Sequence, residues 1–141
     1  TLAGTMSPFP HSIDPGATLA EARQMMAAHD IHHLPVTHDG QIVGVISDGD
    51  IFVAGSLAPD RAQQTRVAAI YSREPYVVDI HTRLDEVAGT MAARRIGSAI
   101  VTRQGKLAGI LTHTDACRVL AELVRSLSPD PDEAPPGGWV A

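Results

Sequence analysis

Two stretches of the chain, GVISDGD and GILTHTD, carry a hydroxyl residue followed three positions later by an aspartate. They pair Ser47 with Asp50 and Thr112 with Asp115. A hydroxyl at the start of a helix can donate to a phosphate oxygen, where unpaired backbone N–H groups and the positive end of the helix dipole also favour an anion. An aspartate one turn later can accept two hydrogen bonds from a cis-diol such as ribose. Residues of these types at this spacing could therefore bind a nucleotide.

The same spacing has a second interpretation that needs no ligand. Ser or Thr followed three residues later by an acidic side chain can form a capping box, in which each side chain bonds the other residue's backbone N–H. A cap of this kind stabilises a helix by about 1 kcal/mol. On the residues alone, both interpretations stay open. The small Gly44 and Gly109, which precede the hydroxyl residues, are expected to leave room beside the strand.

Histidines form a second group of chemically capable residues. The stretch HDIHHLPVTH holds four of the seven histidines of the chain, namely His29, His32, His33 and His38. Imidazole is a common zinc, copper or nickel ligand, so a metal site is one hypothesis. The corresponding stretch of the second half of the chain, RRIGSAIVTR, has no histidine. We therefore expect ordinary surface histidines and no metal ligands, and keep a histidine metal site as a weaker alternative.

The elements that position these residues occur twice. Residues 6–56 align with residues 71–121 at an offset of 65 without a gap, and about one position in four is identical. Such self-similarity over some fifty residues indicates two copies of one supersecondary unit. Each copy reads as strand, helix, strand, strand, helix, which predicts an α/β protein of the α+β type.

Local signals define these elements. Short extended pieces are expected at 11–14 and 76–79, each followed by a helix. Capping-box spacings open those helices at Thr18-x-x-Glu21 and at Thr82-x-x-Asp85. Two apolar runs then flank Asp39-Gly40 in the first copy and Gln104-Gly105 in the second, which predicts a hairpin in each. The last helices are expected to begin near Asp48 and near His113.

These elements divide the chain into three parts. We predict a first unit with its N-terminal segment at 1–60, a second unit at 61–127, and a mobile tail rich in acid, Pro and Gly at 128–141. The polar segment 56–66, which contains Pro59, is expected to join the two units as a loop or a short helix.

Composition excludes several classes of function. The chain has 141 residues, 44% hydrophobic content, a formal charge of −5 and five aromatic Phe, Tyr and Trp residues. A nucleic-acid or membrane-surface partner is not expected, because phosphate neutralisation and base stacking need basic and aromatic surface. The lone Cys117 and the lack of an export signal favour a cytoplasmic protein. No nucleophile elbow and no Gly-rich phosphate loop occur, so we expect no enzyme.

The doubled pattern resembles a known family. The runs LPVxxxGxxVGVISxxD, from Leu34 to Asp50, and AIVxxxGxxAGILTxxD, from Ala99 to Asp115, look like paired CBS domains of the cystathionine β-synthase type, called a Bateman module. The resemblance covers about residues 2–126. It implies two tandem β-α-β-β-α units packed as a pseudo-two-fold pair. It also implies adenine nucleotides (AMP, ADP or ATP) or S-adenosylmethionine as regulatory ligands in two clefts between the units.

The resemblance also assigns residues to the ligand. Ser47 and Thr112 would meet phosphate, and Asp50 and Asp115 would meet ribose. The adenine would lie against the first strand and the start of the hairpin, which carries it to Ser12, Ile13, His33, Leu34 and Pro35 in one half and to Val77, Val78, Ser98, Ala99 and Ile100 in the other.

The charged residues near each signature predict which of the two clefts binds a phosphate-bearing ligand better. Many family members carry a basic residue just before the signature aspartate, where this chain has Gly49 and Thr114. Asp48 adds a negative charge that would repel several phosphates from the first cleft. Because His113 is neutral or positive, we expect the second cleft to be the better site.

The resemblance leads to one main hypothesis of function and one alternative. The main hypothesis is a module that senses a nucleotide, forms a homodimer and signals to an unknown partner protein. A structural dimerisation module with empty clefts is the alternative. Family modules pair amphipathic helices across a two-fold axis, so the candidate interface residues are apolar positions on the last helices, namely Ile51, Val53, Val119 and Leu123.

Overall fold

The computed structural model describes residues 2–8, 11–61 and 63–128. Its elements, in chain order, are α1 (Leu2–Thr5), β1 (Ser7–Pro8), α2 (Leu19–His29), β2 (His33–His38), β3 (Gln41–Ser47), α3 (Asp48–Leu57), the 3₁₀ helix η1 (Val67–Ala69), β4 (Val77–Asp79), α4 (Leu84–Arg94), β5 (Ser98–Arg103), β6 (Lys106–Thr112) and α5 (His113–Leu127). This order confirms the α+β class and the doubled helix–hairpin–helix unit. The tail expected to be mobile lies outside the described residues, apart from Ser128.

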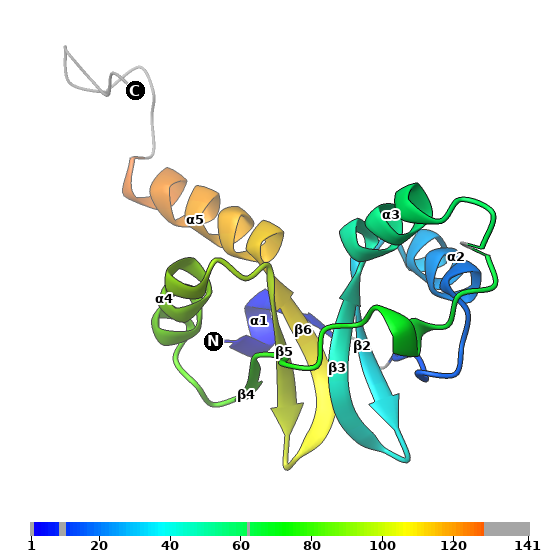
Figure 1. Cartoon of the computed structure of the whole chain (residues 1–141). Helices are drawn as coiled ribbons and strands as arrows, with labels where there is room; N and C mark the ends of the chain where they lie inside the picture. The colour runs from blue at the N-terminus through cyan, green and yellow to red at the C-terminus, as the bar shows by residue number, and fades with distance from the viewer. Residues whose placement is uncertain (1, 9–10, 62, 129–141) are drawn as a thin grey trace.

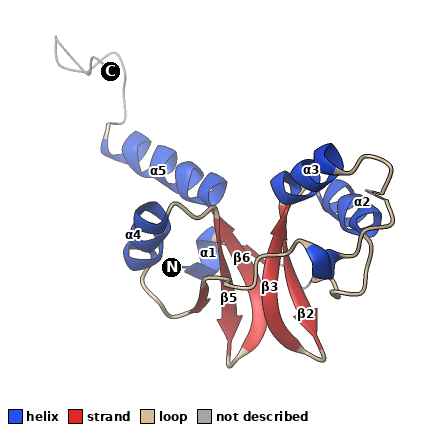
Figure 2. Ribbon diagram, in the orientation of Figure 1, coloured by secondary structure: helices blue, strands red, loops and turns tan. Residues whose placement is uncertain are grey.

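The strands form two sheets that lie side by side in the middle of the molecule (Figure 1). One sheet has the order β1-β6-β5-β4 and the other is the β2-β3 hairpin. Helices α2 and α3 lie on one side of the strands, and α4 and α5 on the other (Figure 2). The extended piece expected at 76–79 is β4, which pairs with β5 in parallel. Its counterpart at 11–14 is reduced to one parallel bridge between Ile13 and Val36.

The repeat is also visible in the backbone. Asp39 and Gly40 both have positive φ angles, of 49° and 77°, and so do Gln104 and Gly105, at 53° and 78°. Two positive φ angles in a two-residue loop define the hairpin turn that matches the twist of the strands. The hairpins predicted from Asp-Gly and Gln-Gly are therefore confirmed in both units.

The segment that precedes each unit packs against the other unit. Ser7 of β1 pairs with Ile110 of β6, and 65 residues later Ser72 bridges to Val45 of β3. Leu2 is fully buried in the core of the second unit, although residues 2–8 precede the first unit in the sequence. This reciprocal exchange ties the two units together through the backbone.

The exchange corrects one expectation about the glycines. A side chain on Gly44 would collide with the Ser72 carbonyl oxygen and the Tyr71 ring. The space beside this strand is therefore occupied by the exchanged segment and not left open. Gly44 is needed because another stretch of backbone passes directly over it.

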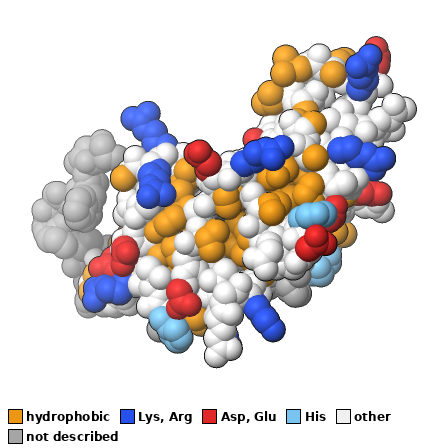
Figure 3. Space-filling model, turned by 60° about the horizontal axis from the view of Figure 1, so that its bottom comes forward, with side chains coloured by type: hydrophobic (Ala, Val, Ile, Leu, Met, Phe, Trp, Pro, Cys, Tyr) orange, Lys and Arg blue, Asp and Glu red, His pale blue; other side chains and the backbone are white. Residues whose placement is uncertain are grey.

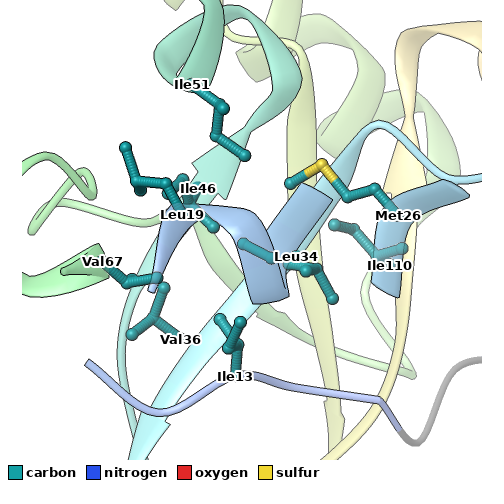
Figure 4. Close-up of a cluster of buried hydrophobic side chains, with 10 residues drawn as sticks. Ile13, Leu19, Met26, Leu34, Val36, Ile46, Ile51, Val67 and Ile110 are labelled. Atoms are coloured by element: carbon teal, nitrogen blue, oxygen red, sulfur yellow. The ribbon is translucent and has the colours of Figure 1, made fainter. Parts of the chain in front are cut away.

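Two hydrophobic clusters hold the units. The first gathers residues of α2, β2, β3, α3 and η1, and it also contains Ile110 of β6 (Figure 4). The second gathers Leu2 with residues of β4, α4, β5 and β6. Because Ile110 comes from the second unit, the two cores meet between the sheets. Hydrophobic side chains also reach the surface, and Figure 3 shows them gathered in the middle of one face, with Lys and Arg spread singly among acidic residues.

The first residues of α2 and α4 test the two capping boxes expected from the sequence. Thr18 caps α2 with a complete capping box, as predicted. The capping box expected at Thr82 and Asp85 is wrong, because α4 begins after Arg83, whose side chain caps nothing. The repeat offset of 65 itself places Arg83 opposite Thr18. Asp85 instead pairs with the Arg83 guanidinium at 2.9 Å.

Candidate functional site: a cleft between the two units

A cleft of about 480 Å³ lies between the two units, and both contribute to its wall. The first unit supplies the end of α2 and the start of β2, together with the first residue of α3. The second unit supplies the end of β6 and the first turns of α5. The lining residues are Asp30, Ile31, His32, His33, Asp48, Ile110, Thr112, His113, Thr114, Asp115 and Arg118. Small-molecule sites in proteins commonly measure about 300 to 1,000 Å³.

The second signature lies in this cleft and is tied up in hydrogen bonds of its own. The Thr112 Oγ1 accepts from the Asp115 backbone N–H at 3.2 Å and donates to the Asp115 carboxylate at 3.1 Å. The Thr112 backbone N–H donates to the same carboxylate at 2.9 Å. Asp115 is buried, with 2% of its surface exposed, and its other oxygen accepts from Arg118 at 3.0 Å. The capping interpretation is thus present in the structure.

The first signature forms an equivalent cap away from this cleft. Ser47 and Asp50 bond each other's backbone N–H groups at 2.9 and 3.1 Å at the start of α3. Neither residue lines the cleft that holds Thr112 and Asp115. The chain therefore offers the same cap twice, once at the cleft and once outside it.

Asp48 is the acidic residue whose position differs most from the expectation. Its charge was assigned to the first cleft, yet it lines the cleft of the second signature. There its carboxylate meets the His32 Nδ1 at 2.7 Å. The cleft expected to be more favourable to phosphates therefore carries this carboxylate as well.

Two histidines from different units face each other across Gly97. The His33 and His113 rings are 6.3 Å apart in an edge-on arrangement. A side chain on Gly97 would lie 3.1 Å from His113 and 3.2 Å from His33. The His33 Nδ1 is buried without a hydrogen-bond partner in the described part of the chain. Burial lowers the pKa of His33, and the neighbouring His113 lowers this pKa further. His33 is therefore a neutral ring with one unused polar atom.

The residues predicted to bind the ligand do not all come together at this cleft. His33, Thr112, His113 and Asp115 line the cleft together. Several predicted adenine contacts are instead buried with the core, namely Ile13, Leu34, Pro35, Val78, Ser98, Ala99 and Ile100. Of the remaining two, Ser12 bonds the Thr37 hydroxyl at 2.8 Å and Val77 is exposed on β4. The roles assigned to these residues stay predictions.

Arg118 is one of the cleft residues that the sequence did not assign to the ligand; the others include Asp30, Ile31, His32, Ile110 and Thr114. It is the basic side chain that a ligand phosphate would need, and it reaches the cleft from the second turn of α5. Its position three residues after Asp115 on the predicted helix was the available signal, since such pairs lie on one helix face.

The side chains of the histidine-rich stretch do not gather at one site in the fold. His29 stacks on His11 at 3.9 Å, His32 pairs with Asp48, and His38 pairs with Asp14 at 3.3 Å. Among residues 2–8, 11–61 and 63–128, no three His, Cys, Asp or Glu side chains come together as a metal site. Nor does any helix of those residues have the length and apolar character to cross a bilayer.

Comparison with known proteins decides the family. Residues 2–56 and 67–122 each match the CBS domain family. The chain belongs to the CBS domain family. Both matches include the exchanged segment that precedes the unit, and together they cover most of the chain. The resemblance seen in the two signature runs is thereby confirmed, and the cleft lies between two CBS domains.

Relatives and solved structures agree with this assignment. Hypoxic response protein 1 of Mycobacterium tuberculosis (strain CDC 1551 / Oshkosh) is 33% identical over 107 residues, or 74% of each chain. A solved structure of Hypoxic Response Protein I contains two coordinated zinc ions; it has a TM-score of 0.70 and 26% identity over 84% of this chain and 97% of its own. The CBS domain pair of protein MJ0100 has a TM-score of 0.73 and 25% identity over 84% of this chain and 98% of its own. It was solved with 5′-methylthioadenosine and S-adenosyl-L-methionine.

Proposed function

We propose that this protein is a regulatory module that binds a small adenosine-containing ligand in the cleft between its two CBS domains and acts on a partner protein. The candidate ligands are AMP, ADP, ATP and S-adenosylmethionine. The observation that carries the proposal is the composition of the cleft wall, which joins residues 30–33 of the first domain to Thr112–Asp115 of the second. A ligand there contacts both domains at once.

Contact with both domains is what a sensor needs. A ligand shifts a conformational equilibrium only by as much as it binds one arrangement better than another. Because the cleft wall is split between the domains, a ligand that fills it favours one relative packing of the two. The signal to a partner would be that change of packing.

Two observations support an adenosine-containing ligand: the similarity to a CBS domain pair solved with such ligands, and the polar side chains at the cleft of this chain. The CBS pair of MJ0100 was solved with two adenosyl compounds. In this chain His33 and His113 each bring an imidazole ring to the cleft wall, beside the Thr112 hydroxyl residue. The Asp115 carboxylate also borders the cleft and has acceptor capacity beyond its present bonds.

Zinc is the second ligand to consider, because the solved structure of Hypoxic Response Protein I contains it. The described residues of this chain bring no three metal-ligating side chains together. The proposal therefore concerns an organic ligand, and zinc serves as a comparison in the test.

Thermal unfolding against a panel of compounds tests the proposal. AMP, ADP, ATP, S-adenosylmethionine, NAD and zinc chloride would each be added to the full chain. A compound present at 100 times its dissociation constant adds about 2.7 kcal/mol of stability, which raises the melting temperature by several degrees in a domain of this size. We expect a shift with at least one adenosine compound. No shift with any of them, with or without magnesium, would leave a structural module with an empty cleft.

A further inference from the structure

The acidic lining of the cleft points to the class of ligand that it selects. Three carboxylates border the cleft, those of Asp30, Asp48 and Asp115, together with one guanidinium, that of Arg118. The guanidinium is already paired with Asp115 at 3.0 Å. Asp48 pairs with the imidazole of His32. A phosphate entering this cleft would therefore meet more negative than positive charge.

Several of the groups that ordinarily bind phosphate at a helix start are also in use. The Thr112 hydroxyl donates its proton to Asp115. The backbone N–H of Thr112 donates to the same carboxylate, and that of His113 donates to the Gly97 carbonyl at 3.1 Å. The Asp115 backbone N–H donates to Thr112 Oγ1. The carboxylate of Asp115 thus occupies the place of an anion at the start of α5.

Three histidines line the cleft, and His33 is one that does not supply the missing charge. The His33 ring is held neutral by its burial and by His113 beside it, which lower its pKa. The His113 Nδ1 lies 3.2 Å from the Gly97 carbonyl oxygen and is engaged there. A neutral imidazole can bond a base or a sugar hydroxyl, but it does not attract a phosphate by charge.

We infer that this cleft selects an adenosine-type ligand that carries no phosphate at its 5′ end, either uncharged or positively charged, and that Asp48 and Asp30 impose this choice. The inference rests on the proposed function and narrows it. A nucleoside, a thioether nucleoside or an adenosyl sulfonium fits the description. AMP, ADP and ATP do not, because their phosphates meet three carboxylates and a single guanidinium that is already paired with Asp115.

Calorimetric titration of the full chain at low ionic strength tests the inference. The compounds are 5′-methylthioadenosine, S-adenosylmethionine, AMP and magnesium-free ATP. We expect the first two to bind at least tenfold more tightly than AMP, and ATP to bind most weakly. Added salt should reduce the difference in affinity between these compounds, because it screens charge repulsion.

Two variants test whether Asp48 and Asp30 are responsible for the weaker binding of AMP. Asp48→Asn and Asp30→Asn each remove one negative charge and should strengthen AMP binding about three- to tenfold relative to 5′-methylthioadenosine. Asparagine suits the left-handed backbone of Asp30, whose φ is 51°. Asp60→Asn is the matched control, since Asp60 is an exposed residue that does not line the cleft, and it should leave the ratio unchanged.

The outcomes separate the inference from the proposed function. AMP or ATP binding as tightly as 5′-methylthioadenosine would overturn the inference and leave the proposed function standing. An unchanged ratio in both Asp48→Asn and Asp30→Asn would overturn the assignment to these residues. No binding by any of the four compounds would defeat the proposed function, and the inference with it.

Discussion

His33 is the residue whose environment departs most from that of a surface histidine. Its folded pKa lies below the usual 6.5 because burial and His113 disfavour the charged ring. The unfolded chain therefore takes up this proton first as the pH falls. Stability from this residue is fully present above about pH 6.5 and declines as the pH falls below that value towards the folded pKa.

His38 provides the contrast for a measurement. Its pKa is raised, chiefly by the hydrogen bond with Asp14. In an NMR titration of the imidazole signals, we predict that His33 titrates below 6.5 and His38 above it. A midpoint for His33 at or above that of His38 would contradict the buried environment described for the cleft.

At the scale of single elements, the capping boxes give a prediction with an internal control. Thr18 caps α2 through both reciprocal bonds, at 3.0 and 3.1 Å. Thr18→Ala should therefore lower the free energy of unfolding by about 1 kcal/mol. Thr82→Ala should change it by no more than about 0.5 kcal/mol, because Thr82 lies before the cap of α4 and caps nothing. Urea titration of both variants checks the difference, and equal losses would mean that Thr82 does cap the helix.

The exchanged segment predicts opposite signs for two glycine substitutions. Gly44→Ala should destabilise the fold by about 1 to 3 kcal/mol, because the added methyl meets the Ser72 carbonyl and the Tyr71 ring. Gly89→Ala in α4 meets nothing within 4 Å and should stabilise the helix by about 0.5 to 1 kcal/mol. Thermal unfolding of the two variants measures both effects. A neutral Gly44→Ala would show that residues 71 and 72 do not pack over β3.

How much the sequence predicts differs from element to element. The hairpins, the last helices and three of the four helix caps were predictable, because Asp-Gly turns and Ser/Thr-x-x-acid spacings act within a few residues. The exchange of leading segments was not, since no local signal says which strand Ser7 or Ser72 joins. The position of Asp48 in the second cleft depends on the same tertiary arrangement. Leu34 and Ala99 were assigned to the adenine because they lie at the start of a strand, but the fold buries both side chains in its cores.

At the scale of the whole molecule, the outer faces of α3 and α5 are too apolar for isolated surface helices. Phe52 and Leu57 on α3 are 72% and 81% exposed, and Leu120 and Leu127 on α5 are 60% and 75% exposed. Of the interface residues expected from the sequence, Val53 and Leu123 are exposed, Val119 is half-buried, and Ile51 is part of the first core. Ile51 therefore cannot serve as an interface residue.

These exposed faces lead us to predict a homodimer that buries them. Analytical ultracentrifugation at micromolar concentration should show a dimer for the wild type. Leu123→Glu should shift the equilibrium towards monomer, because a buried unpaired charge is costly. Val77→Thr, at an exposed position on β4, is the control and should remain dimeric. A wild-type chain that sediments as a monomer would contradict the prediction.

Because the same helix cap occurs twice, ligand binding in the cleft that contains the second signature can be tested with a matched pair of variants. Asp115→Asn and Asp50→Asn make the same change at equivalent caps, of which only the first borders the cleft. The measurement is the melting shift that saturating 5′-methylthioadenosine produces in wild type and both variants. We expect a shift of several degrees in wild type and in Asp50→Asn, and its loss in Asp115→Asn. Equal shifts in all three proteins, or a loss confined to Asp50→Asn, would contradict this expectation.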